Sequence, residues 1–239
     1  MLSSLEENKV KVNYFITCVI YLTFTIMLYF IKTPSINKRM FPKLTWDVHS
    51  NNKTIYLTFD DGPTPEITDW VLNQLKVYNA KATFFCIGKN ITNQPILLQK
   101  INNEGHTIGN HTNHHLNNWK VSHKTYIEDV EQTQEILKQH LGSTSNQLFR
   151  PPYGKIKLKS AKKLLSKGYK IIMWDVLSAD FDQSITPEKC LENTLKNTTD
   201  GSIVIFHDSV KAFENLKFVL PKTLDHFSKK GFTFESLTV

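Results

Sequence analysis

The sequence predicts an α/β fold built on a parallel sheet, either open or closed into a barrel, over residues 52–239. Short strand-like runs alternate with helical stretches, which is the pattern of a parallel sheet with helices outside it. The strand-like runs are apolar along most of their length, as strands buried on both faces are. No repeat or low-complexity tract interrupts this pattern, so we expect one domain with one core.

The predicted elements follow one another in a regular order. The strand-like runs are residues 55–59, 82–88, 106–110, 147–151, 169–176, 202–208 and 232–237. The helical stretches between them are residues 66–79, 93–104, 123–141, 156–167, 187–197 and 212–230. Each strand-like run before the last one ends in, or is followed by, a loop that could carry functional groups.

Candidate functional residues lie where these predicted strands end. In chain order they are Asp60 and Asp61, His111 and His115, Arg150, Asp180, and His207 with Asp208. Active sites of α/β barrels and open sheets gather at the carboxyl ends of the strands. Acidic, basic and imidazole groups from separate strand ends therefore predict one site at one rim of the sheet.

The adjacent carboxylates of Asp60 and Asp61 indicate a bound cation. Two anions this close repel each other unless a cation or a proton lies between them. His111 and His115 are four residues apart, which brings two imidazoles to one face of a helical turn, while His114 points elsewhere. Two imidazoles and one carboxylate suit Zn²⁺ or a similar divalent ion, and the second aspartate could be a general base. The alternative, that both aspartates cap the following helix, would not require the buried strand before them.

The motifs resemble those of a known family. "TFDDG" (58–62), "HTNHH" (111–115), "RPPYG" (150–154) and "IFH" (205–207) resemble, in order, the motifs of polysaccharide deacetylases of carbohydrate esterase family 4. The resemblance covers roughly residues 52–239. It implies a shortened (β/α) barrel that hydrolyses N-acetyl, sometimes O-acetyl, groups of sugars such as N-acetylglucosamine polymers.

The resemblance also implies a metal and a base. Asp61, His111 and His115 would hold one divalent metal ion, zinc first, with cobalt, nickel or manganese as alternatives. Asp60 would be the catalytic base, and Arg150 would pair with it and orient it. An arginine stays charged in proteins, so this pairing is physically reasonable.

The same resemblance assigns an acid and a substrate wall. His207 would protonate the leaving amine, Asp180 would polarise His207, and the backbone near Tyr153 would help to hold the developing oxyanion. The family often has Asp-x-x-Asp-Trp in its fourth motif, where this chain has Leu177 in place of the first acid and Phe181 in place of the tryptophan. The aromatic wall is kept, while substrate preference and the tuning of His207 stay open.

Two other functions fit parts of the sequence. A different metal-dependent amidohydrolase, acting on a small molecule, would have a deep closed pocket. A catalytically silent carbohydrate-binding module would have lost ligand or base residues, whereas every required side-chain type is present here. The motifs do not identify the polymer, which could be a chitooligosaccharide, peptidoglycan or another acetylated glycan.

A membrane anchor is predicted before this domain. Residues 14–31 contain no charge and are just long enough to cross a bilayer, and no small-residue cleavage site follows. We therefore expect a tail (1–13), an uncleaved single-pass anchor in the cell membrane (14–31) and a linker (32–51). The alternative for residues 14–31 is a buried core helix, but such a helix would normally show a polar face. The positive-inside rule would keep the basic segment after the span in the cytoplasm. Acetylated surface glycans instead favour an outer catalytic domain, which is our expectation.

The net charge of +7 is concentrated in one segment. Residues 155–170 combine apolar residues at helical spacing with lysines on the other face. Those lysines form either a solvated face or a surface that attracts anionic lipid or polymer. They are not paired with an aromatic array, so we expect no nucleic-acid partner, and we expect a monomer. The three cysteines, Cys18, Cys86 and Cys190, predict no disulfide framework.

Overall fold

A curled sheet of parallel strands forms the centre of the protein. The computed structural model describes residues 30–142 and 145–238. The sheet has eight strands in the order β5-β4-β3-β2-β1-β7-β6, and β8 pairs with β1 beside this path. The strands are β1 (Thr54–Asp60), β2 (Ala82–Cys86), β3 (Thr107–Asn110), β4 (Leu148–Phe149), β5 (Lys170–Ile171), β6 (Val176–Leu177), β7 (Ile203–His207) and β8 (Thr233–Phe234). The predicted parallel α/β sheet is confirmed.

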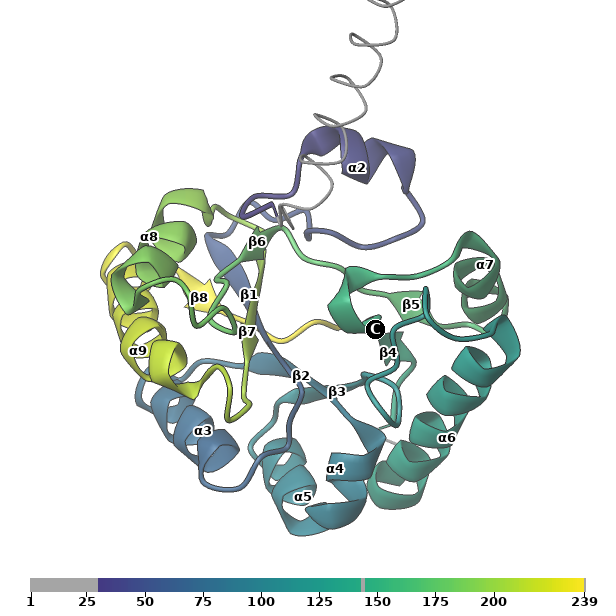
Figure 1. Cartoon of the computed structure of the whole chain (residues 1–239). Helices are drawn as coiled ribbons and strands as arrows, with labels where there is room; N and C mark the ends of the chain where they lie inside the picture. The colour runs from purple at the N-terminus through teal and green to yellow at the C-terminus, as the bar shows by residue number, and fades with distance from the viewer. Residues whose placement is uncertain (1–29, 143–144, 239) are drawn as a thin grey trace, which may run out of the picture. The chain divides into compact units, whose positions relative to one another are not determined.

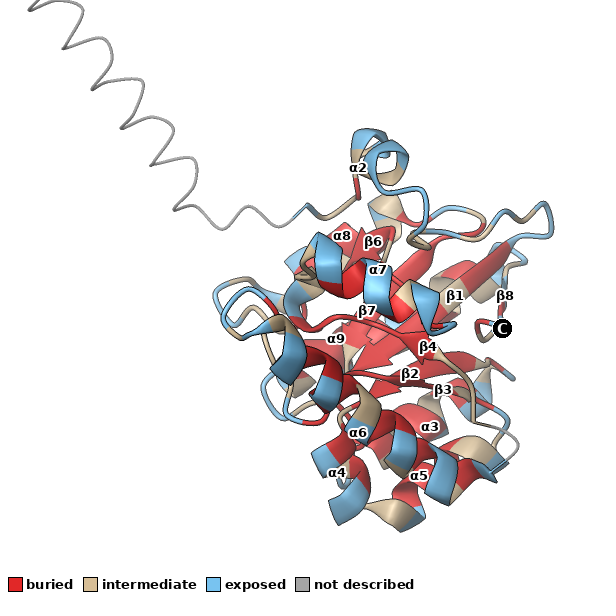
Figure 2. Cartoon of the chain, turned by 90° about the vertical axis from the view of Figure 1, so that its right-hand side faces the viewer, coloured by how far each residue is buried: buried red, intermediate tan, exposed pale blue. Residues whose placement is uncertain are grey.

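Helices surround the outer face of this sheet (Figure 1). They are α2 (Ser35–Met40), α3 (Ile67–Val77), α4 (Gly88–Asn93), α5 (Pro95–Asn103), α6 (His123–Leu141), α7 (Leu158–Ser166), α8 (Pro187–Asn197) and α9 (Phe213–Lys229), with a short 3-10 turn η2 (Pro152–Gly154). The strands are buried, while the helices turn exposed residues outward (Figure 2). This is the layered arrangement expected when apolar strands lie beneath amphipathic helices.

Alternate residues of the central strands pack into two different clusters of apolar side chains, one on each face of the sheet. Phe59, Phe84 and Phe206 lie side by side on β1, β2 and β7, with ring centroids 5.1 and 5.9 Å from Phe59, and pack into the core beneath the helices. Phe85, the next residue on β2, joins a separate inner cluster with Leu148 and others. Because side chains alternate across a strand, β2 fills both faces of the sheet. This inner layer is the floor of the site described below.

Strands β5 and β6 are close in sequence, but they are the two edge strands at opposite ends of the sheet. The run 169–176 was predicted as one strand; instead its ends pair with β4 and β7, and the sheet curls into an incomplete barrel. Residues from the segment expected to be a linker lie along this seam. Thr45 bridges to Ile172, and Lys32 bridges to Val176.

Charged side chains fix that segment to the barrel. The ammonium groups of Lys32 and Lys38 lie 2.5 and 2.7 Å from the buried carboxylate of Asp175, and Lys38 also pairs with Asp47. Ser202 donates a further hydrogen bond to Asp175 at 2.6 Å. Residues 32–47 therefore contribute directly to the folded domain.

The membrane prediction concerns a different part of the chain. Residues 14–29 of the predicted anchor lie outside the described residues. Within 30–142 and 145–238, no helix has the length and apolar character needed to cross a membrane. Cys86 and Cys190 are buried free thiols.

Candidate active site

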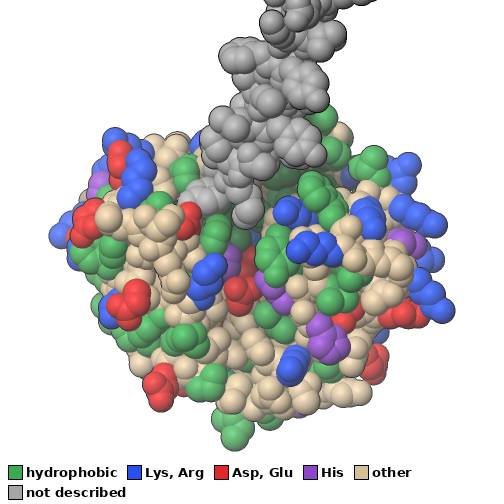
Figure 3. Space-filling view, in the orientation of Figure 1, with side chains coloured by type: hydrophobic (Ala, Val, Ile, Leu, Met, Phe, Trp, Pro, Cys, Tyr) green, Lys and Arg blue, Asp and Glu red, His purple; other side chains and the backbone are tan. Residues whose placement is uncertain are grey.

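The strand register brings the two predicted proton-transfer residues side by side. Asp60 ends β1 and His207 ends β7, and the two residues are partners in the parallel ladder between these strands. His111 follows β3, Arg150 follows β4, and Asp180 follows β6. Histidine and acidic side chains meet near the centre of the face in Figure 3, with basic side chains around them. The predicted residues therefore come together at one rim of the sheet.

Asp60 is held by the fully buried guanidinium of Arg150. Arg150 Nη1 donates to Asp60 Oδ1 at 2.8 Å and to Thr58 Oγ1 at 2.7 Å, and Nη2 donates to the carbonyl of Met173 at 2.8 Å. The guanidinium carbon lies 4.2 Å from the ring centroid of Phe85. Arginine's fixed fork of donors thus holds one oxygen of Asp60 in place and leaves Oδ2 facing His111, 3.7 Å from its Nε2.

Asp61, His111 and His115 form a possible metal centre. One ligand atom from each lies within 4.8 Å of the other two. Asp61 Oδ1 is 3.6 Å from Nε2 of His111 and 3.2 Å from Nε2 of His115, and it is buried without a hydrogen-bond partner. A buried carboxylate oxygen rarely lacks a partner, so this oxygen and two converging imidazoles fit a divalent cation.

The second ring nitrogen of each imidazole is also held. His111 Nδ1 lies 2.8 Å from the carbonyl oxygen of Arg150, so Nδ1 carries the proton and Nε2 keeps a free lone pair. Burial lowers the pKa of His111 to about 4, which keeps the ring neutral, as a metal ligand must be. His115 Nδ1 lies 3.1 Å from the hydroxyl of Tyr153.

Backbone strain is concentrated around this centre. Asp61, Thr112, His115, Tyr153 and Ala179 all have φ between 53 and 81° although none is glycine. Such conformations cost on the order of 1–3 kcal/mol each and persist where the surrounding structure determines them. Two of the three metal-ligand candidates thus owe their direction to a left-handed backbone.

Tyr153 depends on the glycine that follows it. Gly154 has φ of 64°, and a Cβ added there would lie 2.5 Å from the ring of Trp174. Only glycine fits this turn without moving Trp174. The turn aims the exposed Tyr153 ring at His115, with 4.6 Å between the ring centroids. The oxyanion role of the Tyr153 backbone stays a prediction.

Asp180 and His207 form a second buried pair opposite the base. Asp180 Oδ1 lies 2.8 Å from His207 Nδ1, and Asp180 Oδ2 accepts the backbone N–H of His207 at 2.8 Å. Burial alone would lower the pKa of His207, but the carboxylates of Asp180, Asp61 and Asp60 together outweigh burial and raise it to about 9. Phe181 packs edge-on against His207 with 5.1 Å between the ring centroids. His207 is therefore protonated at neutral pH, with Nε2 left to donate.

His114 lies apart from this centre, as its position between the two ligand candidates predicted. Its Nδ1 contacts Asp129 Oδ1 of α6 at 2.6 Å, and its side chain is half exposed. The other oxygen of Asp129 accepts the backbone N–H groups of Asn113 and His114. Asp129 thus anchors the loop that carries His111 and His115.

Asp208 is a site residue to which the sequence assigned no role. Its buried carboxylate accepts the backbone N–H of Gly62 at 3.1 Å and the hydroxyl of Thr68 at 2.5 Å, and its own N–H donates to the carbonyl of Asp60. A Cβ on Gly62 would lie 2.1 Å from Asp208 Oδ2. Burial raises the pKa of Asp208 to about 8. The only sequence signal was its position next to His207.

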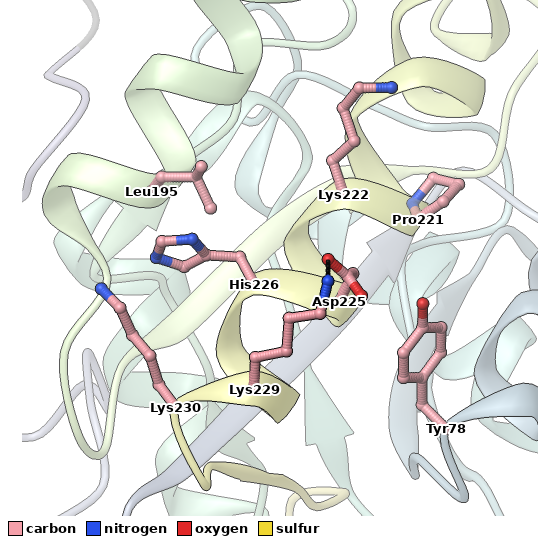
Figure 4. Close-up of a pocket in the computed structure, with 8 residues that line it drawn as sticks. All are labelled: Tyr78, Leu195, Pro221, Lys222, Asp225, His226, Lys229 and Lys230. Atoms are coloured by element: carbon pink, nitrogen blue, oxygen red, sulfur yellow. Dashed lines mark hydrogen bonds and ion pairs between the residues drawn. The ribbon is translucent and has the colours of Figure 1, made fainter.

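A hollow also exists away from this rim. It has a volume of about 550 Å³ and lies beside α8 and α9, where Asp225 pairs with Lys229 at 2.8 Å (Figure 4). It is lined by Tyr78, Leu195, Pro221, Lys222, Asp225, His226, Lys229 and Lys230. None of the predicted site residues reaches it. The predicted site residues lie at the rim of the sheet instead.

Known proteins share both the sequence pattern and the fold. The family model of polysaccharide deacetylases matches residues 47–172. A peptidoglycan-N-acetylglucosamine deacetylase of Bacillus cereus is 35% identical over 188 residues, covering 78% of this chain and 68% of that protein. The peptidoglycan-N-acetylmuramic acid deacetylase PdaC of Bacillus subtilis is 33% identical over 163 residues, covering 67% of this chain and 33% of that protein.

A solved structure extends the likeness to three dimensions. The crystal structure of the peptidoglycan N-acetylglucosamine deacetylase Bc1960 superposes with a TM-score of 0.78 at 32% identity, covering 86% of this chain and 95% of that one. Asp180 and His207 lie beyond the segment matched by the family model, yet the fold brings them to the same rim. The chain belongs to the polysaccharide deacetylase family.

Proposed function

We propose that this enzyme removes N-acetyl groups from the amino sugars of peptidoglycan. The observation that carries the proposal is the pairing of Asp60 and His207 on adjacent strands, next to three converging ligand atoms. The relatives that support the substrate act on N-acetylglucosamine or N-acetylmuramic acid units of peptidoglycan. That these relatives act on a polymer favours a polymer over the small molecule of an amidohydrolase.

In the proposed reaction, water attacks the acetyl carbon, the C–N bond breaks, and acetate and a free amine leave. A divalent ion held by Asp61, His111 and His115 would polarise the acetyl carbonyl and lower the pKa of the attacking water. Asp60 accepts the water's proton at Oδ2, because Oδ1 is held by Arg150. One oxygen of Asp60 thus fixes the carboxylate in place, and the other is free to accept the proton.

The leaving nitrogen needs a proton, and His207 is placed to supply it. Its Nδ1 is held by Asp180, so the transferable proton is on Nε2. An amine is a poor leaving group until it is protonated, and a raised pKa keeps this acid charged at neutral pH. Phe181 shields one side of the imidazole from water.

We propose Zn²⁺ as the resident ion, since two imidazoles and one carboxylate with open positions are typical of catalytic zinc. Cobalt, nickel and manganese are the alternatives. The test is acetate release from purified peptidoglycan and from chitooligosaccharides by the protein before chelation, after chelation and after return of each metal. Activity on peptidoglycan that disappears with chelator and returns with zinc is the expected result. Undiminished activity after complete metal removal would contradict the mechanism.

We also propose that the enzyme is a single-pass protein of the cell membrane with its catalytic domain outside. The proposal is supported by the uncharged residues 14–31 and by the surface location of peptidoglycan. The lysines and arginine after that span favour the opposite orientation. Reporter fusions after residue 45 decide between the two, because alkaline phosphatase is active only outside the membrane and green fluorescent protein preferentially inside.

A further inference from the structure

The loop that follows the metal-ligand candidates presents an exposed indole. Trp119 is 62% exposed, far more than a large apolar ring normally is in a folded domain. It lies four residues beyond His115, a length of chain that reaches at most about 14 Å. The ring therefore lies within reach of an oligosaccharide bound at the catalytic rim.

A lysine from a different loop lies over this ring. Lys155 Nζ is 5.2 Å from the centroid of Trp119, and no carboxylate within residues 30–142 and 145–238 pairs with it. Lys155 is two residues beyond Tyr153, whose hydroxyl contacts His115 at 3.1 Å. The Trp119–Lys155 pair, called the platform here, thus borders the catalytic centre through Tyr153.

Hydrogen bonds within the protein fix the platform before any ligand arrives. The fully buried Asn118 accepts the backbone N–H of Lys157 at 2.7 Å, and Lys157 Nζ donates to the carbonyl of Val121 at 2.8 Å. The backbone N–H of Trp119 donates to Asn117 Oδ1 at 2.9 Å. These bonds join the loop of Trp119 to the loop of Lys155, so binding costs little ordering of either loop.

We propose that the platform is a binding subsite for a carboxylate-bearing sugar unit of the glycan, next to the unit that loses its acetyl group. The faces of an indole are negative and attract the slightly positive C–H groups of a pyranose ring. The unpaired ammonium of Lys155 supplies a counter-charge for a carboxylate, such as those on the peptide stems of peptidoglycan. The inference rests on the proposed function and deepens it by naming two residues that would recognise a charged unit of peptidoglycan next to the reacting sugar.

The two parts of the platform make separable contributions. Stacking on Trp119 stabilises binding of any sugar ring, charged or neutral. The ammonium of Lys155 stabilises binding only of a sugar that carries an anion, and this stabilisation weakens as salt screens the two charges. A neutral glycan and an anionic glycan of the same length therefore distinguish the two residues.

The test uses chitotetraose and a peptidoglycan tetrasaccharide with free stem carboxylates. Binding of each is measured by calorimetry on chelator-treated protein, which prevents turnover, and kcat and KM are measured on the zinc-loaded enzyme. The variants are Trp119→Ala and Lys155→Gln. Their controls are Ile96→Ala, at an exposed apolar position on α5, and Lys159→Gln, at an exposed lysine on α7. Circular dichroism verifies that each variant is folded.

We expect Trp119→Ala to weaken binding of both glycans about tenfold, as the loss of a central aromatic contact does. Lys155→Gln should weaken binding of the anionic glycan about threefold at low salt, with no such loss for chitotetraose. The same ratios should appear in KM rather than in kcat.

Two results would overturn the subsite. One is a dissociation constant for Trp119→Ala equal to that of Ile96→Ala, and the other is an equal loss for both glycans in Lys155→Gln. Failure of the wild-type, zinc-loaded enzyme to release acetate would contradict the proposed function instead. The calorimetric comparison would still decide the subsite, because it needs no turnover.

Discussion

Asp180 holds His207 at two points, accepting the backbone N–H at one oxygen and contacting the ring Nδ1 at the other, each at 2.8 Å. The first contact fixes where the residue lies, and the second fixes its tautomer and, together with the charges of Asp61 and Asp60, raises its pKa to about 9 against the effect of burial. Asp180 therefore fixes the position of the proposed acid and contributes most of the charge that keeps it protonated.

This pair predicts a shift in the pH profile of Asp180→Asn. His207 acts as an acid only while protonated, so kcat/KM of the wild type should fall as pH rises through about 9. Asparagine keeps an acceptor for the backbone N–H but removes the negative charge. The pKa of His207 should then fall, and the alkaline limb of the kcat/KM profile should move toward neutral pH. Glu188→Gln, at an exposed position on α8, is the control; equal alkaline limbs in both variants would exclude the proposed role.

The metal-ligand candidates predict a contrast between neighbouring histidines. His111→Ala or His115→Ala should lower the bound zinc sharply, because each removes one of three converging ligand atoms. His114→Ala should keep zinc near the wild-type content, since this ring faces Asp129. Elemental analysis of protein purified with excess zinc measures the difference. Loss of zinc in His114→Ala with retention in His111→Ala would reverse the assignment.

How well the fold could be predicted depended on the length of each apolar run. The runs behind β1, β2 and β7 are long and bounded by polar residues, and the predicted and observed strands nearly coincide. Residues 169–176 were harder to interpret because aromatic and aliphatic residues continue through the whole run. Their division between β5 and β6 follows from closure of the sheet, which is a long-range event with no local signal.

Helix boundaries show the same difference between local and distant causes. The predicted helix 93–104 is confirmed as α5, and α4, which was not predicted, ends just before it at Asn93; Gln94 and Pro95 divide the two helices. This division has a local cause, since the residue before a proline avoids helical backbone, and it could have been anticipated. The bridges of residues 32 and 45 to the barrel seam had no such signal.

The site could be predicted at the level of residues but not at the level of contacts. Strand-end positions and the family motifs predicted the residues of the rim. The role of Asp208 depends on the N–H of Gly62, far away in sequence, and on the hydroxyl of Thr68. Trp119 and Lys155 likewise meet only in the fold, although the sequence had suggested that the basic segment lacks aromatic partners.

Asp208 predicts a loss of activity without direct contact with substrate. Asp208→Ala removes the acceptor for Gly62 and Thr68 and frees the turn after Asp61. Because the turn positions both aspartates, kcat should fall at least about tenfold, and zinc affinity should fall with it. Asp208→Asn keeps one acceptor oxygen and should recover most of the loss. Equal defects in the two variants would contradict this role, because Asp208→Asn keeps both the volume of the side chain and one acceptor oxygen.

His106 predicts a pH-dependent stability. It is buried, accepts the backbone N–H of Ala82 at 3.2 Å, and burial lowers its pKa to about 4 from an unfolded value of 6.5. As pH falls, His106 therefore takes up a proton in the unfolded state before it does so in the folded state. The contribution of His106 to the free energy of unfolding is fully present above pH 6.5 and is lost as pH falls to about 4. The loss amounts to at most about 3 kcal/mol.

The variant His106→Gln tests this assignment. Urea unfolding of metal-free protein between pH 4 and 7 should show a flatter dependence of unfolding free energy on pH than the wild type. Metal-free protein removes any contribution from ion binding. The exposed His49→Gln is the control and should keep the wild-type slope. Parallel slopes for His106→Gln and wild type would assign the acid sensitivity to other groups.

The adjacent aspartates should respond differently to the same substitution. Asp61→Asn weakens a metal ligand by removing its charge, so bound zinc and activity should fall together, and excess zinc should partly restore activity. Asp60→Asn keeps an oxygen for Arg150 but cannot accept a proton at neutral pH. That variant should keep its zinc and lose about 10²–10⁴-fold in kcat, the usual contribution of a positioned base, without rescue by added zinc.

Removing one partner of a buried ion pair costs about 3–5 kcal/mol, so unfolding curves must accompany the kinetics. Zinc loss in Asp60→Asn with retention in Asp61→Asn would exchange the two roles, and near-wild-type turnover in both would reject the mechanism.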